Sequence, residues 1–395
     1  RMQGHGEHTR SSPAYCGFRI ALQPEEAKMF YFVTKTGLPM FDACRAYGLA
    51  LILDRLSAET GAMAQVCIED LGPFYRLEAP NMATLLSVKS ASVFDDLLTV
   101  SSGWCGVLLT TARSPNIGKV KPKSRKELED EVGKVRRTLK GLSNWLSAFG
   151  RPIPCELRAS RAKGFQTLPG SLDVSAAKGI RRPKLGGYSE GEQIYVPEEQ
   201  WAVALLGGAN FIRWTWAGGN YAGLLPAPQS LTLRNHQDIR AIADGGDLCG
   251  VSTTTAAGHY AVRLAEALRR RRASQAVVKD RYATLIVQAM SFAGSQWKAM
   301  SGGLFPLELP MHLMDSDLNI SADVFGLWDF LFRWGSVQGN EPLAVMLADF
   351  LAQPSLETFE HYARTHLRMT LADKRQRQYS PYQIEWMKEV LSHVG

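Results

Sequence analysis

Lysine and arginine are concentrated in one part of this chain, and of all its residues they offer the clearest binding chemistry. Residues 113–184 contain eighteen Lys and Arg but only six Asp and Glu, a net charge of +12. Because the whole chain carries +7, all the other residues together sum to −5. A positive excess confined to one region is typical of a surface that binds a polyanion such as a nucleic acid.

Three basic stretches make up the predicted nucleic-acid-binding site. In loop 113–126, Asn116 is suited to reading adenine, and Lys119 to contacting phosphate or guanine. Insertion 151–184 places Phe165 among its cations, as in grooves that stack single-stranded bases. A run of four arginines, 269–272, is the third stretch. The predicted binding residues are Arg113, Asn116, Lys119, Lys121, Lys123, Arg125, Lys126, Arg161, Lys163, Arg181, Arg182, Lys184, Arg269 and Arg270.

Each stretch taken alone is more typical of a solvated charged surface. Together with the negative remainder of the chain, the three stretches favour polyanion binding.

Sequence motifs of catalysis are absent from the chain. It has no P-loop, no GxGxxG, no GxSxG and no HExxH, and its six cysteines show no CxxC spacing. We therefore predict no catalytic residue, no metal and no cofactor. Asp315, Asp317 and Asp323 could together hold a metal, but capping and turn roles fit them better.

The element expected at the centre of the fold lies near the N-terminus. A short strand, Phe30–Val33, leads through a Gly-Leu-Pro turn into a helix that runs from Pro39 to Leu56 and is apolar on nearly every side. Such a helix lies buried in a large protein or in a membrane. Four charged residues in or beside it (Asp42, Arg45, Asp54 and Arg55) exclude a bilayer span of about 20 apolar residues, so we expect a core helix.

The elements that must position the basic stretches follow in order. We expect a strand within Met63–Glu69, a helix over Ala91–Leu98, a buried strand over Trp104–Thr111 and a helix over Glu127–Phe149. Residues 151–199 are expected to be a partly mobile basic insertion. Two strands follow, Phe211–Trp216 and Tyr221–Leu233. The glycine pairs 207–208, 218–219, 245–246 and 302–303 are interpreted as turns.

Helices are expected to dominate from residue 236 onwards. The predicted helices are Asp238–Ala243, Thr255–Arg272, Lys279–Trp297, Ala322–Trp334, Pro342–Leu351, Leu356–Leu371 and Pro381–His393. The fold class is therefore α+β. We divide the chain into a flexible arm (1–28), a mixed α/β domain (29–235) with a basic insertion (113–184), and a C-terminal helical bundle (236–395).

The segment Thr36–Ala43 resembles an N-terminal motif of large subunits of type I CRISPR interference (Cascade) complexes. That motif runs roughly Gly-x-Pro-x-x-Asp-Ala, and Gly37, Pro39, Asp42 and Ala43 match it. The expected layout is also similar, although the short chain suggests a compact or transposon-associated variety. The resemblance implies a non-catalytic subunit that binds crRNA with the backbone and cap subunits. It also implies that the subunit reads a PAM in double-stranded DNA, helps open the target for R-loop formation, and cooperates with a recruited helicase-nuclease or transposition protein.

Two other functions remain open from the residues alone. One is a nucleic-acid-processing enzyme with a dispersed acidic site, and the other is an interaction scaffold whose basic surface meets an acidic protein. The first residues lack the apolar core of a signal peptide. We therefore expect a cytoplasmic protein that does not contact a membrane, and the resemblance implies a role in antiviral defence.

Overall fold

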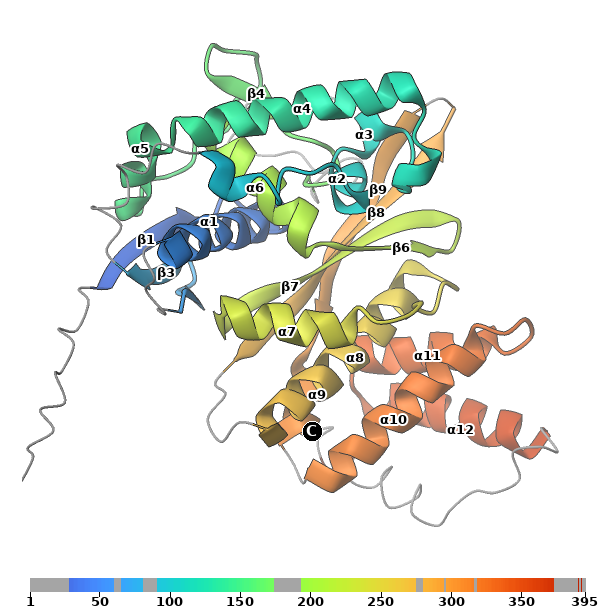
Figure 1. Ribbon diagram of the computed structural model, residues 1–395. Coiled ribbons are helices and arrows are strands. Elements are labelled where there is room, and N and C mark those ends of the chain that lie inside the picture. Colours follow the sequence, from blue (N-terminus) through green and yellow to red (C-terminus); the bar gives the residue numbers. More distant parts are fainter. Residues whose placement is uncertain are drawn as a thin grey trace, which may run out of the picture.

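The computed structural model describes residues 28–59, 65–80, 91–173, 193–274, 280–294, 296–315 and 318–372, with residues 390 and 392 (Figure 1). The predicted α+β class is confirmed. The predicted arm lies outside the described residues except for Lys28, which begins the first strand. The helix predicted at Pro381–His393 lies outside them apart from residues 390 and 392.

One antiparallel sheet of seven strands runs through the molecule. Its order is β1-β3-β2-β7-β8-β9, and β6 also pairs with β7. The strands are β1 (Lys28–Thr34), β2 (Cys67–Asp70), β3 (Phe74–Pro80), β6 (Arg213–Ala217), β7 (Asn220–Thr232), β8 (Arg281–Ala293) and β9 (Gln296–Pro306). A second sheet pairs β4 (Phe165–Thr167) with β5 (Tyr195–Pro197).

The predicted core helix is present as α1 (Pro39–Glu59), and its neighbours explain its composition. It packs against the sheet on one side and against α6 (Glu198–Phe211) on another. Residues Phe41, Tyr47 and Leu53 are fully buried, although at 3.6 residues per turn they point in three different directions around the helix. An all-round apolar sequence is what such a doubly covered helix requires.

Further helices cover α6 and complete the upper half of the molecule in Figure 1. Both α2 (Ser102–Val107) and α4 (Pro122–Lys140) pack on α6. The chain between and after them forms α3 (Leu109–Ala112), the 3₁₀ helix η3 (Ile117–Lys119), α5 (Leu142–Trp145) and the 3₁₀ helix η4 (Leu146–Gly150). The predicted strand Trp104–Thr111 is therefore wrong. A short apolar run suits a buried helix as well as a strand, and here it lies against α6.

Two segments predicted as helices also differ. Ala91–Leu98 contains only the 3₁₀ helix η2 (Ala91–Phe94). The helix predicted over Lys279–Trp297 is wrong, because this segment forms β8, the β8–β9 turn and the start of β9. Tyr282, Leu285 and Ile286 are all buried. A strand with apolar residues on both faces loses the alternation that would identify it, so its spacing resembled that of a helix.

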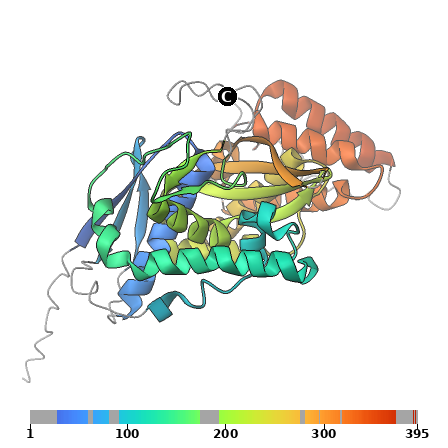
Figure 2. The same cartoon turned by 90° about the horizontal axis from the view of Figure 1, so that it is seen from above.

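The C-terminal half carries α7 (Leu233–Ala243), α8 (Thr253–Ser274), α9 (Glu308–Asp315), α10 (Leu318–Gly335), α11 (Glu341–Ala352) and α12 (Leu356–Ala372). The predicted boundary between residues 235 and 236 falls inside α7, and β7 pairs with β8 across it. In Figure 2, α4 runs along one side of the molecule, and α11 and α12 lie at the opposite corner. Among the described helices, none has both the length and the apolar character to cross a membrane.

Two of the four glycine pairs are turns, as predicted. Gly218 and Gly219 both have positive φ angles, and Gly245–Gly246 ends α7. Gly207–Gly208 instead lies inside α6, and Gly302–Gly303 lies in β9. The α6 pair is required by close helix packing rather than by chain reversal.

Three buried histidines make the stability of the fold depend on pH. Burial holds the pKa of His236 well below its usual value, and it lowers the pKa of His259 and brings that of His366 to about 4. Between pH 6.5 and these lower values, the unfolded chain binds protons that the folded chain does not. The free energy of unfolding should therefore fall as pH decreases, by about 1.4 kcal/mol per pH unit for each histidine.

Urea unfolding between pH 7.5 and pH 5.5 measures this dependence. His366→Gln should reduce the slope by one histidine's share. The matched control variant is His361→Gln, at an exposed position on the same helix. A wild-type stability that stays constant or rises toward pH 5.5 would contradict the burial argument.

Candidate functional site

The segment that we call the basic loop, Arg113–Lys126, contains six Lys and Arg and no Asp or Glu. It begins where α3 ends, at Arg113. This residue has a left-handed backbone (φ 56°), and its N–H donates to the carbonyl of Leu109 (2.8 Å). A left-handed conformation costs a non-glycine residue free energy. Glycine would adopt this conformation at a lower cost in free energy. The presence of arginine instead fits a role for its exposed side chain.

The next turn of the basic loop is built by Asn116. Its Oδ1 accepts the N–H of Gly118 (2.9 Å) and caps η3. Bidentate reading of adenine uses both the oxygen and the nitrogen of an amide. Because this oxygen already holds the turn together, Asn116 is better explained as a positioning residue than as the base reader that we predicted.

The end of the basic loop is helical, which corrects its expected form. Helix α4 begins at Pro122, whereas the predicted helix began at Glu127. Lys123, Arg125 and Lys126 therefore lie on the first turns of α4, whose buried face carries Leu128 and Val132. The helix N-terminus adds positive potential to these cations.

Most cations of the basic loop have no acidic partner in the part of the chain that the structure describes. Arg125 pairs with Glu129 at 3.4 Å, with both side chains more than half exposed. Among the described residues, no carboxylate forms an ion pair with the other five, all of which are exposed: Arg113, Lys119, Lys121, Lys123 and Lys126. The loop therefore presents a positive charge that the described part of the protein does not neutralise.

The insertion after η4 contains five of the predicted cations and the predicted stacking ring, Phe165. Arg161 and Lys163 are exposed. The ring of Phe165 is covered by the guanidinium of Arg158 (4.4 Å), so that face is not free to stack a base. Arg181, Arg182 and Lys184 lie outside the described residues.

The run of four arginines does not join the basic loop. Arg269 and Arg270 both pair with Glu266 (2.6 and 2.7 Å), and Arg271 pairs with Asp238 (2.7 Å). Arg272 donates to the carbonyl of Asp280, just before β8. Strand β8 has 13 residues, so its two ends lie roughly 40 Å apart at about 3.3 Å per residue. The arginines lie at its first end, and the basic loop lies near its other end, where Phe292 pairs with Trp297. These arginines therefore hold α7, α8 and the start of β8 together.

An aromatic cluster missed by the sequence analysis lies beside the basic loop. It consists of Trp214, Trp216, Tyr221, Phe292 and Trp297, contributed by β6, β7, β8 and β9. Trp297 is buried, and its ring centroid lies 5.8 Å from that of Trp216 and 5.4 Å from that of Phe292. Its indole N–H donates to the carbonyl of Arg113 (3.3 Å), which fixes the cluster to the basic loop. Trp216 and Phe292 are 54% and 53% exposed.

The cluster was not expected from the sequence, because the spacing of apolar residues in 279–297 predicted a helix there. In the sheet, Trp216 pairs with Tyr221, and Phe292 pairs with Trp297. The β8–β9 hairpin brings the second pair to the first, near α3 at the upper right of Figure 1. A strand assignment for β8 would have revealed the second pair, since the first lies on β6 and β7, whose segments were expected to be strands.

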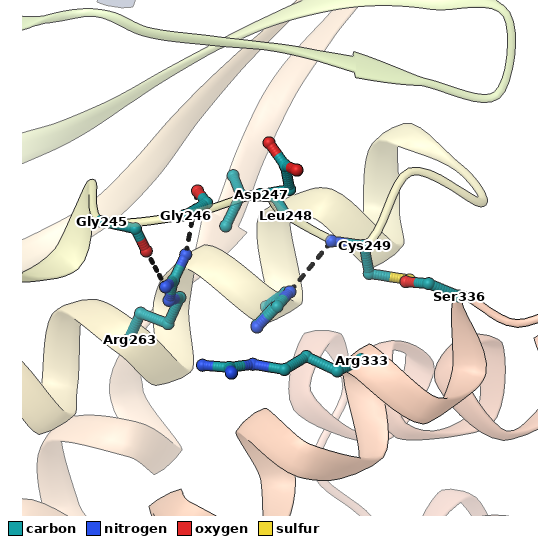
Figure 3. A pocket seen from close by; sticks show the side chains of 9 residues that line it. Gly245, Gly246, Asp247, Leu248, Cys249, Arg263, Arg333 and Ser336 are labelled. Carbon is teal, nitrogen blue, oxygen red and sulfur yellow. Dashed lines mark hydrogen bonds between the residues drawn. The ribbon is translucent and has the colours of Figure 1, made fainter.

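A pocket of about 440 Å³ lies between the loop after α7 and helices α8 and α10 (Figure 3). His259 is one of the residues that line it. The Nδ1 atom of His259 accepts the N–H of Cys249 (2.9 Å), and Nε2 lies 2.9 Å from Oδ1 of Asp329. Burial lowers the pKa of His259, so the ring is neutral and carries its proton on Nε2. With both nitrogens occupied, it is not placed to activate the Cys249 thiol.

The arginines around this pocket are also engaged. Arg333 pairs with Asp329 (2.6 Å), and Arg263 lies 3.5 Å from the same carboxylate. Arg263 also donates to the carbonyls of Gly245 and Gly246, as Figure 3 shows. The arrangement clamps the loop after α7 onto α8 and α10. Among the described residues, no group of three His, Cys, Asp or Glu could hold a metal ion.

The fold and the site define an α+β protein with a positively charged loop at one end of an antiparallel sheet. No family model matches the chain. It is similar to an uncharacterized protein of Archaeoglobus fulgidus, with 27% identity over 374 residues. The match covers 92% of this chain and 98% of the archaeal protein, so the similarity is not confined to one motif.

Proposed function

We propose that this chain is a non-catalytic, DNA-binding large subunit of an RNA-guided complex, similar to those of type I CRISPR interference complexes. It would act in the cytoplasm with a crRNA and neighbouring subunits, hold target duplex DNA beside a short PAM, and help to open it. The observation that carries the proposal is the set of five exposed cations in the basic loop that form no ion pair within the described residues.

The contrast between the two basic clusters supports this choice of site. The four arginines of α8 are engaged by Glu266, Asp238 and the carbonyl of Asp280, so they already serve the fold. Like charges that remain close together and unneutralised repel one another. A phosphate backbone relieves that repulsion and releases its own counterions. The basic loop is therefore where DNA would gain most by binding.

The geometry gives less support to the enzyme alternative. Its acidic residues belong to the region of α9 and α10, at the end of the molecule opposite α3 and α4 (Figure 1). Asp323 is exposed on α10, and Asp317 lies outside the described residues. A dispersed acidic site would need these carboxylates beside the DNA-binding surface.

Charge reversal in the basic loop tests the proposal. Lys119→Glu combined with Lys121→Glu should weaken duplex binding at 0.1 M salt by about tenfold or more. It should also reduce the slope of log K against log[salt] by about 2, because two phosphate contacts are lost. Fluorescence anisotropy with a labelled duplex at several salt concentrations measures both quantities.

The matched control is Arg364→Glu combined with Arg368→Glu. It makes the same change in net charge at exposed positions on α12, far from the basic loop in Figure 1. If both double variants lost affinity equally, the attraction would be a property of net charge, and the basic loop would not be the site.

Isolation of the chain from its own cells tests the class of complex. We expect a stoichiometric short RNA and several further subunits to copurify with it, and we expect the isolated chain to show no metal-dependent cleavage of DNA. A protein that purified alone and cleaved DNA would favour the enzyme alternative instead.

A further inference from the structure

The aromatic cluster beside the basic loop has chemistry that duplex binding does not use. Two of its rings, Trp216 and Phe292, are more than half exposed, and both contact the buried ring of Trp297. Large exposed aromatic side chains are unfavourable in water, and grouped ones mark a binding surface. Paired bases in a duplex have no free ring faces, whereas unpaired bases do.

The cluster is rigidly supported. Trp214 stacks on Tyr221 with ring centroids 5.2 Å apart and planes 9° apart, and Tyr221 also contacts Trp216 (5.4 Å). Tyr221 and Trp297 are each 6% exposed and belong to a small core with Leu109 and Met290. The exposed rings are therefore held in place before any ligand arrives, which lowers the entropy cost of stacking.

The position of the cluster selects its ligand. The indole N–H of Trp297 donates to the backbone of Arg113, where the basic loop begins. A strand whose phosphates contact the basic loop would thus have its bases within reach of Trp216 and Phe292. Aromatic rings beside unpaired cations are the combination that binds single-stranded nucleic acid.

We infer that Trp216 and Phe292 form a stacking platform for unpaired bases of the target DNA, exposed as the duplex opens beside the basic loop. This inference rests on the proposed function and adds a second substrate form, single-stranded DNA, at a separate surface. Stacking depends on the ring faces of the bases and not on their edges, so the platform accepts bases of any sequence.

The test compares single-stranded and duplex DNA on the full chain at fixed salt, by anisotropy. Trp216→Ala should weaken binding of a mixed-sequence single strand by about tenfold. Duplex affinity and the salt dependence of binding should stay unchanged, because no cation is removed. Phe292→Ala should act in the same direction from a different strand, and Trp216→Phe should retain most of the single-strand affinity.

Two controls separate stacking from charge and from folding. An abasic oligonucleotide keeps the phosphates but lacks the bases, so Trp216→Ala should not change its affinity. Phe330→Ala removes a 43%-exposed ring that stacks on Trp334 in α10 and should leave DNA binding intact. Thermal unfolding of each variant shows whether the fold is retained.

The outcomes distinguish the two proposals. Unchanged single-strand affinity in both Trp216→Ala and Phe292→Ala, with duplex binding still dependent on Lys119 and Lys121, would overturn the platform alone. An effect confined to single-stranded RNA would overturn the assignment to target DNA. If the wild-type protein bound neither form of DNA, both proposals would fall.

Discussion

Replacing Asp42 by alanine should lower the free energy of unfolding by about 3–5 kcal/mol, because it leaves a buried arginine without its carboxylate. Asp42 and Arg45 are 2% and 1% exposed, and their charged groups lie 2.6 Å apart. Asp42 also accepts hydrogen bonds from the N–H groups of Thr36 (2.8 Å) and Gly37 (3.2 Å). The change therefore also removes the acceptor of these two N–H groups in the turn before α1. Urea unfolding at pH 7 measures the loss.

Two comparisons make this prediction specific. Glu360→Ala breaks an ion pair with Arg364 on α12 whose side chains are 53% and 74% exposed, and it should cost less than about 1 kcal/mol. The double variant Asp42→Ala/Arg45→Met removes the buried positive charge too, so it should recover part of the loss. Similar small losses in Asp42→Ala and Glu360→Ala would show that the buried charge is not the cause.

Replacing Gly207 by alanine should destabilise the fold by about 3 kcal/mol or more, although alanine favours a helix by about 1 kcal/mol. A Cβ atom at Gly207 would lie 1.9 Å from the carbonyl oxygen of Cys44, and one at Gly48 would lie 1.9 Å from that of Val203. The backbones of α1 and α6 are thus in direct contact from both sides. Any side chain there must push the two helices apart.

The sign of the effect is the informative result. Gly326 lies inside α10 with open space around its Cβ position, so Gly326→Ala should be neutral or stabilise the protein by up to about 1 kcal/mol. Chemical denaturation of both variants gives the comparison. If Gly207→Ala also stabilised the protein, α1 and α6 would not cross this closely.

The segment that carries the family resemblance proves to be structural. Gly37 has a φ angle of 86° that favours glycine, and Pro39 begins α1. Asp42 ties the preceding turn to the helix, and Arg45 reaches Gln200 of α6 (2.9 Å). The motif therefore builds the junction of β1, α1 and α6.

Local sequence predicted those elements whose pattern has a single interpretation. The all-round apolar run of α1 required burial, and the alternation in Phe211–Trp216 predicted a strand, present from Arg213 to Ala217 as β6. The same reasoning failed for β8, because a strand buried on both faces has no alternation. It also failed for Trp104–Thr111, because a short apolar run fits either element.

The sequence by itself determined that the positive charge is concentrated in residues 113–184 and that the core helix lies near the N-terminus, since composition and periodicity are local properties. Only the tertiary structure decided which cations are free. Partners as distant in sequence as Asp238 engage the arginines of α8, whereas among the described residues Arg125 is the one cation of the basic loop with an ion pair. Strand pairing likewise brought Trp216 and Trp297 together from distant positions, because an ion pair or a ring contact depends on distance in space and not on separation along the chain.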